Sequence, residues 1–174
     1  MTERDEQFHD FALARRPGMV HTATMLTAGD RHLAEDVVQK TLASLYINWS
    51  RFRRADNPDG YLRRALVNSL TDERRLIWRR RERSAAELPD TPAAGGNAED
   101  DRVEPLRKAL KQLPPKMRAA VVFRYYYDLD YAETAEALGC SQSTVRSQTA
   151  RALDRLRTVL KSDLPEPMSQ HGVH

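Results

Sequence analysis

The spacing of small, glycine and aliphatic residues in 131–151 restricts the fold of this chain more than any other feature. Ala135, Gly139 and Val145 stand at relative positions 0, +4 and +10. A small residue allows two helices to cross closely, a glycine ends the first helix and permits a tight turn, and an aliphatic residue packs the second helix against the first. This combination predicts a helix-turn-helix over 131–151.

Polar residues at the start of both helices support this prediction. Asp130 and Glu133 have the spacing of a capping box for the first helix, and Ser141 can cap the second. The second helix then carries polar groups that can reach base edges or phosphates of DNA. The predicted DNA contacts are Ser143, Thr144, Ser147, Gln148 and Arg151 on bases, and Arg146 and Arg155 on phosphates. The alternative is an ordinary helical hairpin whose polar face meets solvent.

Basic charge is concentrated in two blocks that an acidic stretch separates. Residues 51–83 hold 11 basic and 5 acidic side chains, and residues 102–161 hold 12 and 6, so each block has a net charge of +6. The whole chain carries only +3, and residues 84–101 hold five acidic side chains and no basic one. Two basic blocks around an acidic spacer indicate two contacts with a polyanion.

Apolar residues recur at helical spacing along most of the chain, which predicts an all-α protein. The stripes are formed by Val38, Leu42, Leu45, Trp49 and Phe52, by Leu62, Leu66, Ser69 and Leu76, and by Leu106, Leu110 and Leu113. Pro17 is expected to start or bend a helix. Residues 51–59 are expected to form a loop, and Pro58 suits the first turn of the next helix.

Composition divides the chain into two small helical domains joined by a flexible acidic linker. The segment 84–101 contains proline, alanine, glycine and acidic residues but almost no large apolar residue, so it cannot bury a core. The predicted boundaries are 1–83 for the first domain, 84–101 for the linker, 102–161 for the second domain and 162–174 for a disordered tail.

Several classes of protein find no support in these residues. Cys140 is the only cysteine, so we expect a small buried residue there and neither a disulfide nor a zinc knuckle. The histidines lack metal-ligand spacing, and no glycine-rich phosphate loop or nucleophile–base pattern occurs. No apolar run approaches the ~20 residues that span a bilayer. We therefore expect a cytoplasmic protein that is not an enzyme and that uses no metal or cofactor.

Three blocks of the sequence resemble sigma factors of the extracytoplasmic-function (ECF) group of the sigma-70 family, especially the actinobacterial type. They are GDRHLAEDVVQKTLASLYINW, NPDGYLRRALVNSLTDERRLIWRRR and LKQLPPKMRAAVVFRYYYDLDYAETAEALGCSQSTVRSQTARALDRLR. The resemblance covers about Glu6 to Lys161 without the linker. It implies a transcription initiation factor in two parts: the first domain docks on RNA polymerase and captures one strand of the melted −10 element, and the second reads the −35 duplex.

The resemblance also assigns individual residues. Asp36 and Gln39 match a D-x-x-Q motif that docks on the β′ clamp helices of the polymerase, whereas Lys40 departs from the usual acid. The residues assigned to the −10 element are Phe52, Arg53, Tyr61, Arg63, Arg64, Asn68, Arg74, Arg75, Arg79 and Arg80. Phe52 and Asn68 would supply the wall and the amide of a pocket for a flipped base. The alternatives are that Phe52 belongs to the core and that Asn68 bonds its own backbone.

Trp78 lies among six arginines between Arg74 and Arg83. We expect it to be a structural anchor, with stacking on a base as the alternative. Tyr125, Tyr126 and Tyr127 are consecutive and cannot all face one side of a helix, so we expect at least one of them in the core.

The partners implied are the RNA polymerase core, through β′ and the β flap, and promoter DNA. An anti-sigma factor is a further candidate, and neither a membrane nor a small-molecule substrate is implied. Two other functions stay open at this point. One is a stand-alone helix-turn-helix regulator whose first domain dimerises or senses a signal, and the other is an inert adaptor with vestigial DNA surfaces.

Overall fold

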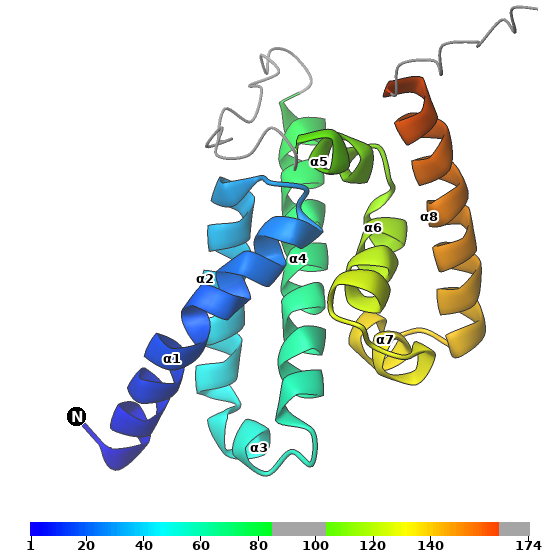
Figure 1. Ribbon diagram of the computed structural model, residues 1–174. Coiled ribbons are helices and arrows are strands. Elements are labelled where there is room, and N and C mark those ends of the chain that lie inside the picture. The colour runs from blue at the N-terminus through cyan, green and yellow to red at the C-terminus, as the bar shows by residue number, and fades with distance from the viewer. Residues whose placement is uncertain (85–103, 164–174) are drawn as a thin grey trace, which may run out of the picture.

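The computed structural model describes residues 1–84 and 104–163, and all regular elements in these ranges are helices (Figure 1). The first domain contains α1 (Glu3–Leu26), α2 (Arg31–Ile47), α3 (Trp49–Arg53) and α4 (Pro58–Arg83). The second contains α5 (Glu104–Lys111), α6 (Pro115–Val121), the π-helical turn η1 (Val122–Tyr126), α7 (Tyr131–Leu138) and α8 (Gln142–Asp163). The all-α prediction is confirmed.

The boundaries of the predicted linker and of the predicted tail differ slightly from expectation. Ser84 caps the end of α4, and α8 continues to Asp163, two residues into the predicted tail. The rest of the linker prediction and of the tail prediction lies outside the described residues. None of the helices in 1–84 and 104–163 combines the length and the apolar character that a membrane span needs.

The first helix begins earlier than the sequence suggests. A capping box joins Thr2 and Asp5, in which the Asp5 amide donates to Thr2 Oγ1 over 3.2 Å and the Thr2 amide donates to Asp5 Oδ2 over 3.0 Å. α1 therefore starts at Glu3 and runs through Pro17. Of the two alternatives predicted for Pro17, the start of a helix is wrong because these caps begin α1 at Glu3, and a bend at Pro17 stays a prediction.

Part of the loop predicted for 51–59 is helical, because α3 carries two rings of a buried aromatic cluster. Trp49 and Phe52 are each 6% exposed, and both pack against Phe11, with ring centroids 5.3 and 5.1 Å away. Burying two large rings on one short helix favours α3, so only residues 54–57 connect α3 to α4. Pro58 begins α4 as predicted, with Asn57 as its N-cap.

The helix-turn-helix is formed by α7 and α8 as predicted. The Glu133 amide donates to Asp130 Oδ1 over 2.7 Å, and the Asp130 amide donates to Glu133 Oε2 over 2.9 Å. Gly139 ends α7 with φ of +66°. Ser141 caps α8, since the Thr144 amide donates to its Oγ over 3.1 Å. Val145 is completely buried and fixes α8 against α7.

The two domains share one contact surface, which we call the domain interface. α7 lies beside α4, α6 contacts α1, and α8 forms the far side of the second domain (Figure 1). Phe123 and Ala137 from the second domain join the same buried cluster as Leu26 and Leu66 from the first. Ala28, in the turn between α1 and α2, joins the core of the second domain instead.

Three apolar residues predicted to pack are exposed to solvent over a substantial part of their surface. Leu76, Leu106 and Trp78 are 39%, 47% and 61% exposed. On α4 the fully buried positions end at Leu70, and the turns that follow are at most half-buried. The expectation of Trp78 as a structural anchor was therefore wrong, and the predicted apolar stripes are too long at these points.

Candidate nucleic-acid interface

Most of the side chains predicted to read duplex DNA lie on the exposed face of α8. Val145 and Ala152 are completely buried on its inner face, which turns the opposite side of the helix to solvent. The exposed residues there are Ser143, Thr144, Arg146, Ser147, Arg151 and Arg155. Hydroxyl and guanidinium groups on one exposed helix are suited to bases and phosphates in a major groove.

Tyr131 holds two arginines beside this face. The guanidinium carbon of Arg146 lies 4.9 Å from the centre of the Tyr131 ring, and that of Arg124 lies 4.3 Å from it. Arg124 also donates to the carbonyl of Leu129. These cation–π contacts orient positive charge at the start of the helix-turn-helix. The sequence analysis missed Tyr131 and Arg124, because their approach depends on the turn that follows η1.

Gln148 differs from the other predicted reading residues. Its side chain is half-buried, and Oε1 is fully buried with no hydrogen-bond partner in the described residues. Gln148 and Thr144 line a cavity of about 180 Å³ that Thr71 and Arg74 of α4 also line. One flank of the predicted reading face is therefore directed at the first domain.

A second candidate surface is a groove of about 620 Å³ on the first domain. Tyr61, Arg64 and Asn68 line it from α4, and the side chain of Asn68 is exposed there. An aromatic ring, a cation and an exposed amide in one groove can stack on a base, bind a phosphate and bond a base edge. Glu136 of α7 reaches the same groove.

Phe52 and Arg53 lie apart from this groove. Phe52 supports it from beneath, with its ring centroid 5.5 Å from that of Tyr61 in an edge-to-face arrangement. Because Phe52 is buried, the alternative that it belongs to the core applies to this residue. Arg53 donates to Gln7 on α1 and lines a separate hollow. The structure thus brings Tyr61, Arg64 and Asn68 together but not Arg53.

The arginines of α4 fall into exposed and partly covered groups. Arg75, Arg79 and Arg80 are exposed. Arg74 is half-buried and donates to the carbonyl of Leu26 over 3.4 Å, and desolvation by burial lowers its pKa. Arg63 is also half-buried, and its Nε has no partner in the described residues. Of these five arginines, Arg75, Arg79 and Arg80 are the ones whose side chains are free to reach phosphates.

The residues of the predicted docking motif lie on the outer face of α2. Asp36 and Gln39 are exposed, as a protein-binding motif requires. Lys40 faces α4, and its Nζ lies 3.8 Å from carboxylate oxygens of both Asp72 and Glu73. Lys40, which stands where an acid is usual, therefore has its ionic partners within the first domain.

A buried arginine joins the two domains, and sequence reasoning missed it. Arg118 is 7% exposed. Its Nε donates to Leu110 O over 2.8 Å, and its Nη1 donates to Leu26 O over 3.1 Å. Burial and the charge of Arg74 lower the pKa of Arg118 to about 10, so the guanidinium stays charged at neutral pH. No spacing rule could have revealed it, because its acceptors are backbone carbonyls.

Cys140 lies half-buried at the domain interface, in the cavity that Gln148 also lines. Desolvation raises the pKa of its thiol. It is therefore less buried than predicted. In residues 1–84 and 104–163, no three His, Cys, Asp or Glu side chains are grouped closely enough to hold a metal ion.

Two family models match this chain. The sigma-70 region 2 model matches residues 13–81, and the sigma-70 region 4 model matches residues 104–156. An RNA polymerase sigma-E factor of Streptomyces coelicolor is 34% identical over 88% of this chain and 86% of its own length. The ECF sigma factor SigM of Mycobacterium tuberculosis is 31% identical over 90% of this chain and 79% of its own length.

Solved structures show the same fold. The sigma factor RpoE of Bartonella quintana, in complex with the anti-sigma factor NepR, superposes with a TM-score of 0.72 at 25% identity and covers 91% of this chain and 99% of its own. CnrH, in complex with the cytosolic domain of CnrY, gives a TM-score of 0.59 at 19% identity over 92% of this chain and 91% of its own. With both region models matched in order and relatives above 30% identity over most of both chains, this chain belongs to the ECF group of the sigma-70 family of RNA polymerase sigma factors.

Proposed function

We propose that this chain directs the RNA polymerase core to specific promoters, with the first domain capturing the melted −10 element and the second reading the −35 element as duplex. The observation that carries the proposal is the pairing of two matched regions, each with its own candidate DNA surface. The groove of Tyr61, Arg64 and Asn68 is suited to an unpaired base and its phosphate, and α8 is suited to a major groove.

The proposed mechanism is physical and involves no bond-making by this chain. The second domain sets the register on paired DNA through Ser143, Ser147 and Arg151, with Arg146 and Arg155 on phosphates. The first domain compensates the lost stacking of an unpaired base by pocket contacts and by phosphate neutralisation from Arg75, Arg79 and Arg80. The polymerase, bound through Asp36 and Gln39 to its β′ clamp helices and through the second domain to its β flap, carries out the chemistry.

We further propose that the segment 84–101 links the two domains along the RNA exit path of the polymerase and that the protein works in the cytoplasm. An anti-sigma factor is a proposed partner, because the RpoE relative was solved with one. A stand-alone regulator is the alternative function. Such a regulator would bind duplex DNA tightly without polymerase, usually at a palindrome.

In vitro transcription with purified core polymerase tests the proposal. The chain should bind core and start transcripts at a defined set of promoters when start sites are mapped across the genome. Tight binding to duplex DNA by the chain alone, without any effect on core polymerase, would instead support the regulator.

An Asp36→Arg variant tests the docking assignment in the same assay. Asp36 is exposed on α2, so the change reverses a surface charge without disturbing the core. We expect the variant to lose co-purification with core polymerase, because a cation would face the basic clamp residues. Asp10→Arg, also exposed but on α1, is the control and should co-purify normally. Normal co-purification of Asp36→Arg would refute the assignment.

A further inference from the structure

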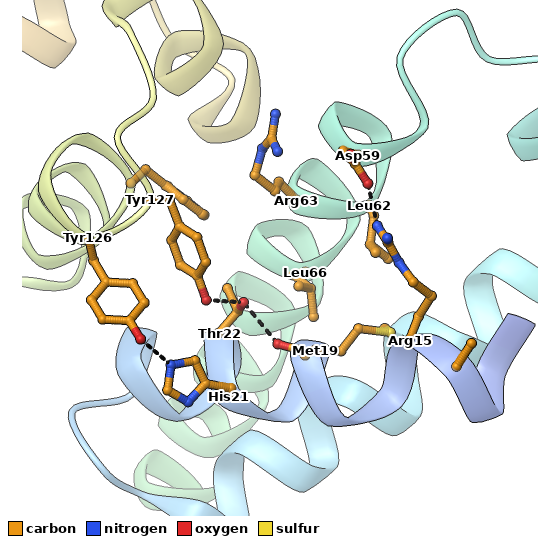
Figure 2. Close-up of a pocket in the computed structure, with 13 residues that line it drawn as sticks. Arg15, Met19, His21, Thr22, Asp59, Leu62, Arg63, Leu66, Tyr126 and Tyr127 are labelled. Carbon is orange, nitrogen blue, oxygen red and sulfur yellow. Dashed lines mark hydrogen bonds and ion pairs between the residues drawn. The ribbon is translucent and has the colours of Figure 1, made fainter.

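A cavity of about 470 Å³ borders α1, α4 and η1, and several of its polar groups bond one another (Figure 2). Tyr126 Oη lies 2.8 Å from His21 Nε2, and Tyr127 Oη lies 2.5 Å from Thr22 Oγ1. A polar ligand would have to replace these bonds before it could use the same groups. The pairing of its lining therefore makes this larger cavity a poor candidate for a binding site.

The smaller cavity that Gln148 and Cys140 line has mainly apolar walls. Its volume is about 180 Å³. Leu26 and Leu70, which are 1% and 5% exposed, supply buried carbon to its walls together with Leu138. A cavity of about 150 Å³ accommodates one benzene molecule. The smaller cavity thus has room for a single six-membered ring with small substituents.

One cation in the wall of this cavity has no carboxylate partner within the part of the chain that the structure describes. Arg74 lines the cavity from α4, is half-buried, and donates to the carbonyl of Leu26 over 3.4 Å. Arg118 donates to the same carbonyl over 3.1 Å, and the charge of Arg74 helps to lower the pKa of Arg118. Two guanidinium groups thus share one neutral acceptor. Because buried charges in proteins are usually neutralised by an opposite charge, this place favours an anion.

Gln148, in the wall of the same cavity, has a buried acceptor without a donor. Its Oε1 is fully buried and has no hydrogen-bond partner among the described residues. Leaving such an acceptor unpaired costs free energy, which a hydroxyl group of a ligand would recover. Gln148 belongs to α8 and Arg74 to α4, so the two groups approach the cavity from different helices.

We propose that this cavity binds a small aromatic acid that carries a hydroxyl group, with the carboxylate on Arg74, the ring against the apolar walls and the hydroxyl donating to Gln148. The volume limits the ligand to one ring, the unpaired cation selects an anion, and the unpaired acceptor selects a donor. Lys116 and Thr144 also line the cavity and are exposed, so the ligand enters on their side. This site goes beyond the proposed function and does not depend on promoter recognition.

Calorimetric titration of the full chain with three matched compounds tests the proposal. Para-hydroxybenzoate carries both polar groups, benzoate lacks the hydroxyl, and para-hydroxybenzamide has a neutral amide in place of the carboxylate. We expect saturable binding of para-hydroxybenzoate, with benzoate roughly fivefold weaker because one hydrogen bond is lost. Para-hydroxybenzamide should be at least about tenfold weaker, because a charge-assisted bond is lost.

Two outcomes of this titration would overturn the proposal. One is the absence of saturable binding of para-hydroxybenzoate at millimolar concentration. The other is equal affinity for para-hydroxybenzoate and either of the other two compounds, since the missing group would then contribute nothing. Promoter-specific transcription with core polymerase is measured separately, so failure of the ligand site and failure of the proposed function are distinguishable.

Two neighbouring arginine variants locate the bound carboxylate. Arg74→Gln removes the cation from the cavity wall and should weaken binding of para-hydroxybenzoate at least about tenfold, with little effect on para-hydroxybenzamide. Arg75→Gln is the matched control, because Arg75 is exposed on the same helix and does not line the cavity. It should bind like the unmodified chain. Equal affinity of the two variants for para-hydroxybenzoate would contradict the assignment, and the comparison of compounds on the unmodified chain decides if Arg74→Gln does not fold.

The reactivity of Cys140 reports whether the compound occupies this cavity. The thiol is half-buried, lines the cavity and is the only thiol of the chain. Saturating para-hydroxybenzoate should slow its reaction with iodoacetamide several-fold, because the ring fills the space that the reagent must enter. The same concentration should not slow the reaction in Arg74→Gln. An unchanged rate in the unmodified chain, with binding seen by calorimetry, would place the ligand elsewhere and overturn the proposal.

Discussion

At the scale of single residues, the carbonyl of Leu26 is one of the points at which the domains meet. It accepts a hydrogen bond from Arg118 of the second domain over 3.1 Å and one from Arg74 of the first over 3.4 Å. Two cations beside one acceptor repel each other, which contributes to the lowered pKa of Arg118. The site is stable because further carbonyls at the end of α5 share the charge of Arg118.

Replacing Arg118 should therefore reduce stability strongly. Arg118→Met leaves buried carbonyls without donors and should lower the free energy of unfolding by roughly 3 kcal/mol. Urea unfolding followed by circular dichroism measures this change. Arg157→Met is the control, since the side chain of Arg157 is 70% exposed, and it should change stability by less than about 0.5 kcal/mol. Equal stability of both variants would show that the carbonyls find other donors.

Arg151 is the exposed residue on α8 that should contribute most to base selection. Arg151→Ala should weaken −35 recognition by roughly 1–3 kcal/mol and relax preference at one base pair. Transcription from a set of single-substitution promoters measures both effects. Arg157→Ala, on the same helix, is the control. Unchanged selectivity of Arg151→Ala would exclude a base contact by this residue.

At the scale of elements, local rules succeeded where a helix end depends on its own neighbours. Asp130, Gly139 and Pro58 begin or end helices at the predicted places. The predictions failed where tertiary contacts determine whether a segment is helical. α3 forms because Trp49 and Phe52 fill an aromatic cluster with α1, a contact that no local pattern reveals. The apolar stripe predicted along α4 extends too far, because nothing in the described chain covers Trp78.

The capping box of α7 should be important for the whole reading unit. Asp130→Ala removes the acceptor for the Glu133 amide and should cost about 1 kcal/mol of stability. Glu133→Gln is the matched control, because glutamine still accepts the Asp130 amide. Thermal unfolding of both variants gives the comparison. A similar loss in the two would indicate that the charge of Glu133, rather than the cap, stabilises α7.

At the scale of the whole molecule, the sequence predicted the parts but not their arrangement. The two basic blocks, the helix-turn-helix and the all-α class followed from spacing and charge. The predicted site was only partly assembled: Tyr61, Arg64 and Asn68 share a groove, whereas Arg53 lies elsewhere and Gln148 faces the first domain. Contacts between domains depend on complementary surfaces, and a single sequence contains no pattern for those.

Electrostatic binding along α4 gives a prediction at this scale. Arg79 and Arg80 are exposed beyond the domain interface, so they are available to phosphates. The double variant Arg79→Ala/Arg80→Ala should reduce the slope of log K against log salt by roughly 0.7 for each lost contact with single-stranded DNA. Titration of the polymerase complex with promoter DNA at several salt concentrations measures the slope. An unchanged slope would place the DNA strand elsewhere.

The π-helical turn η1 constrains the number of residues in this part of the chain. Such a turn holds one more residue than an α-helical turn, and here it allows the adjacent Tyr126 and Tyr127 to reach His21 and Thr22 together. Deleting any one residue from 122–126 would restore regular winding and turn one phenol away from its acceptor. Relatives that keep both tyrosine contacts should therefore have the same number of residues between the positions of Phe123 and Leu129.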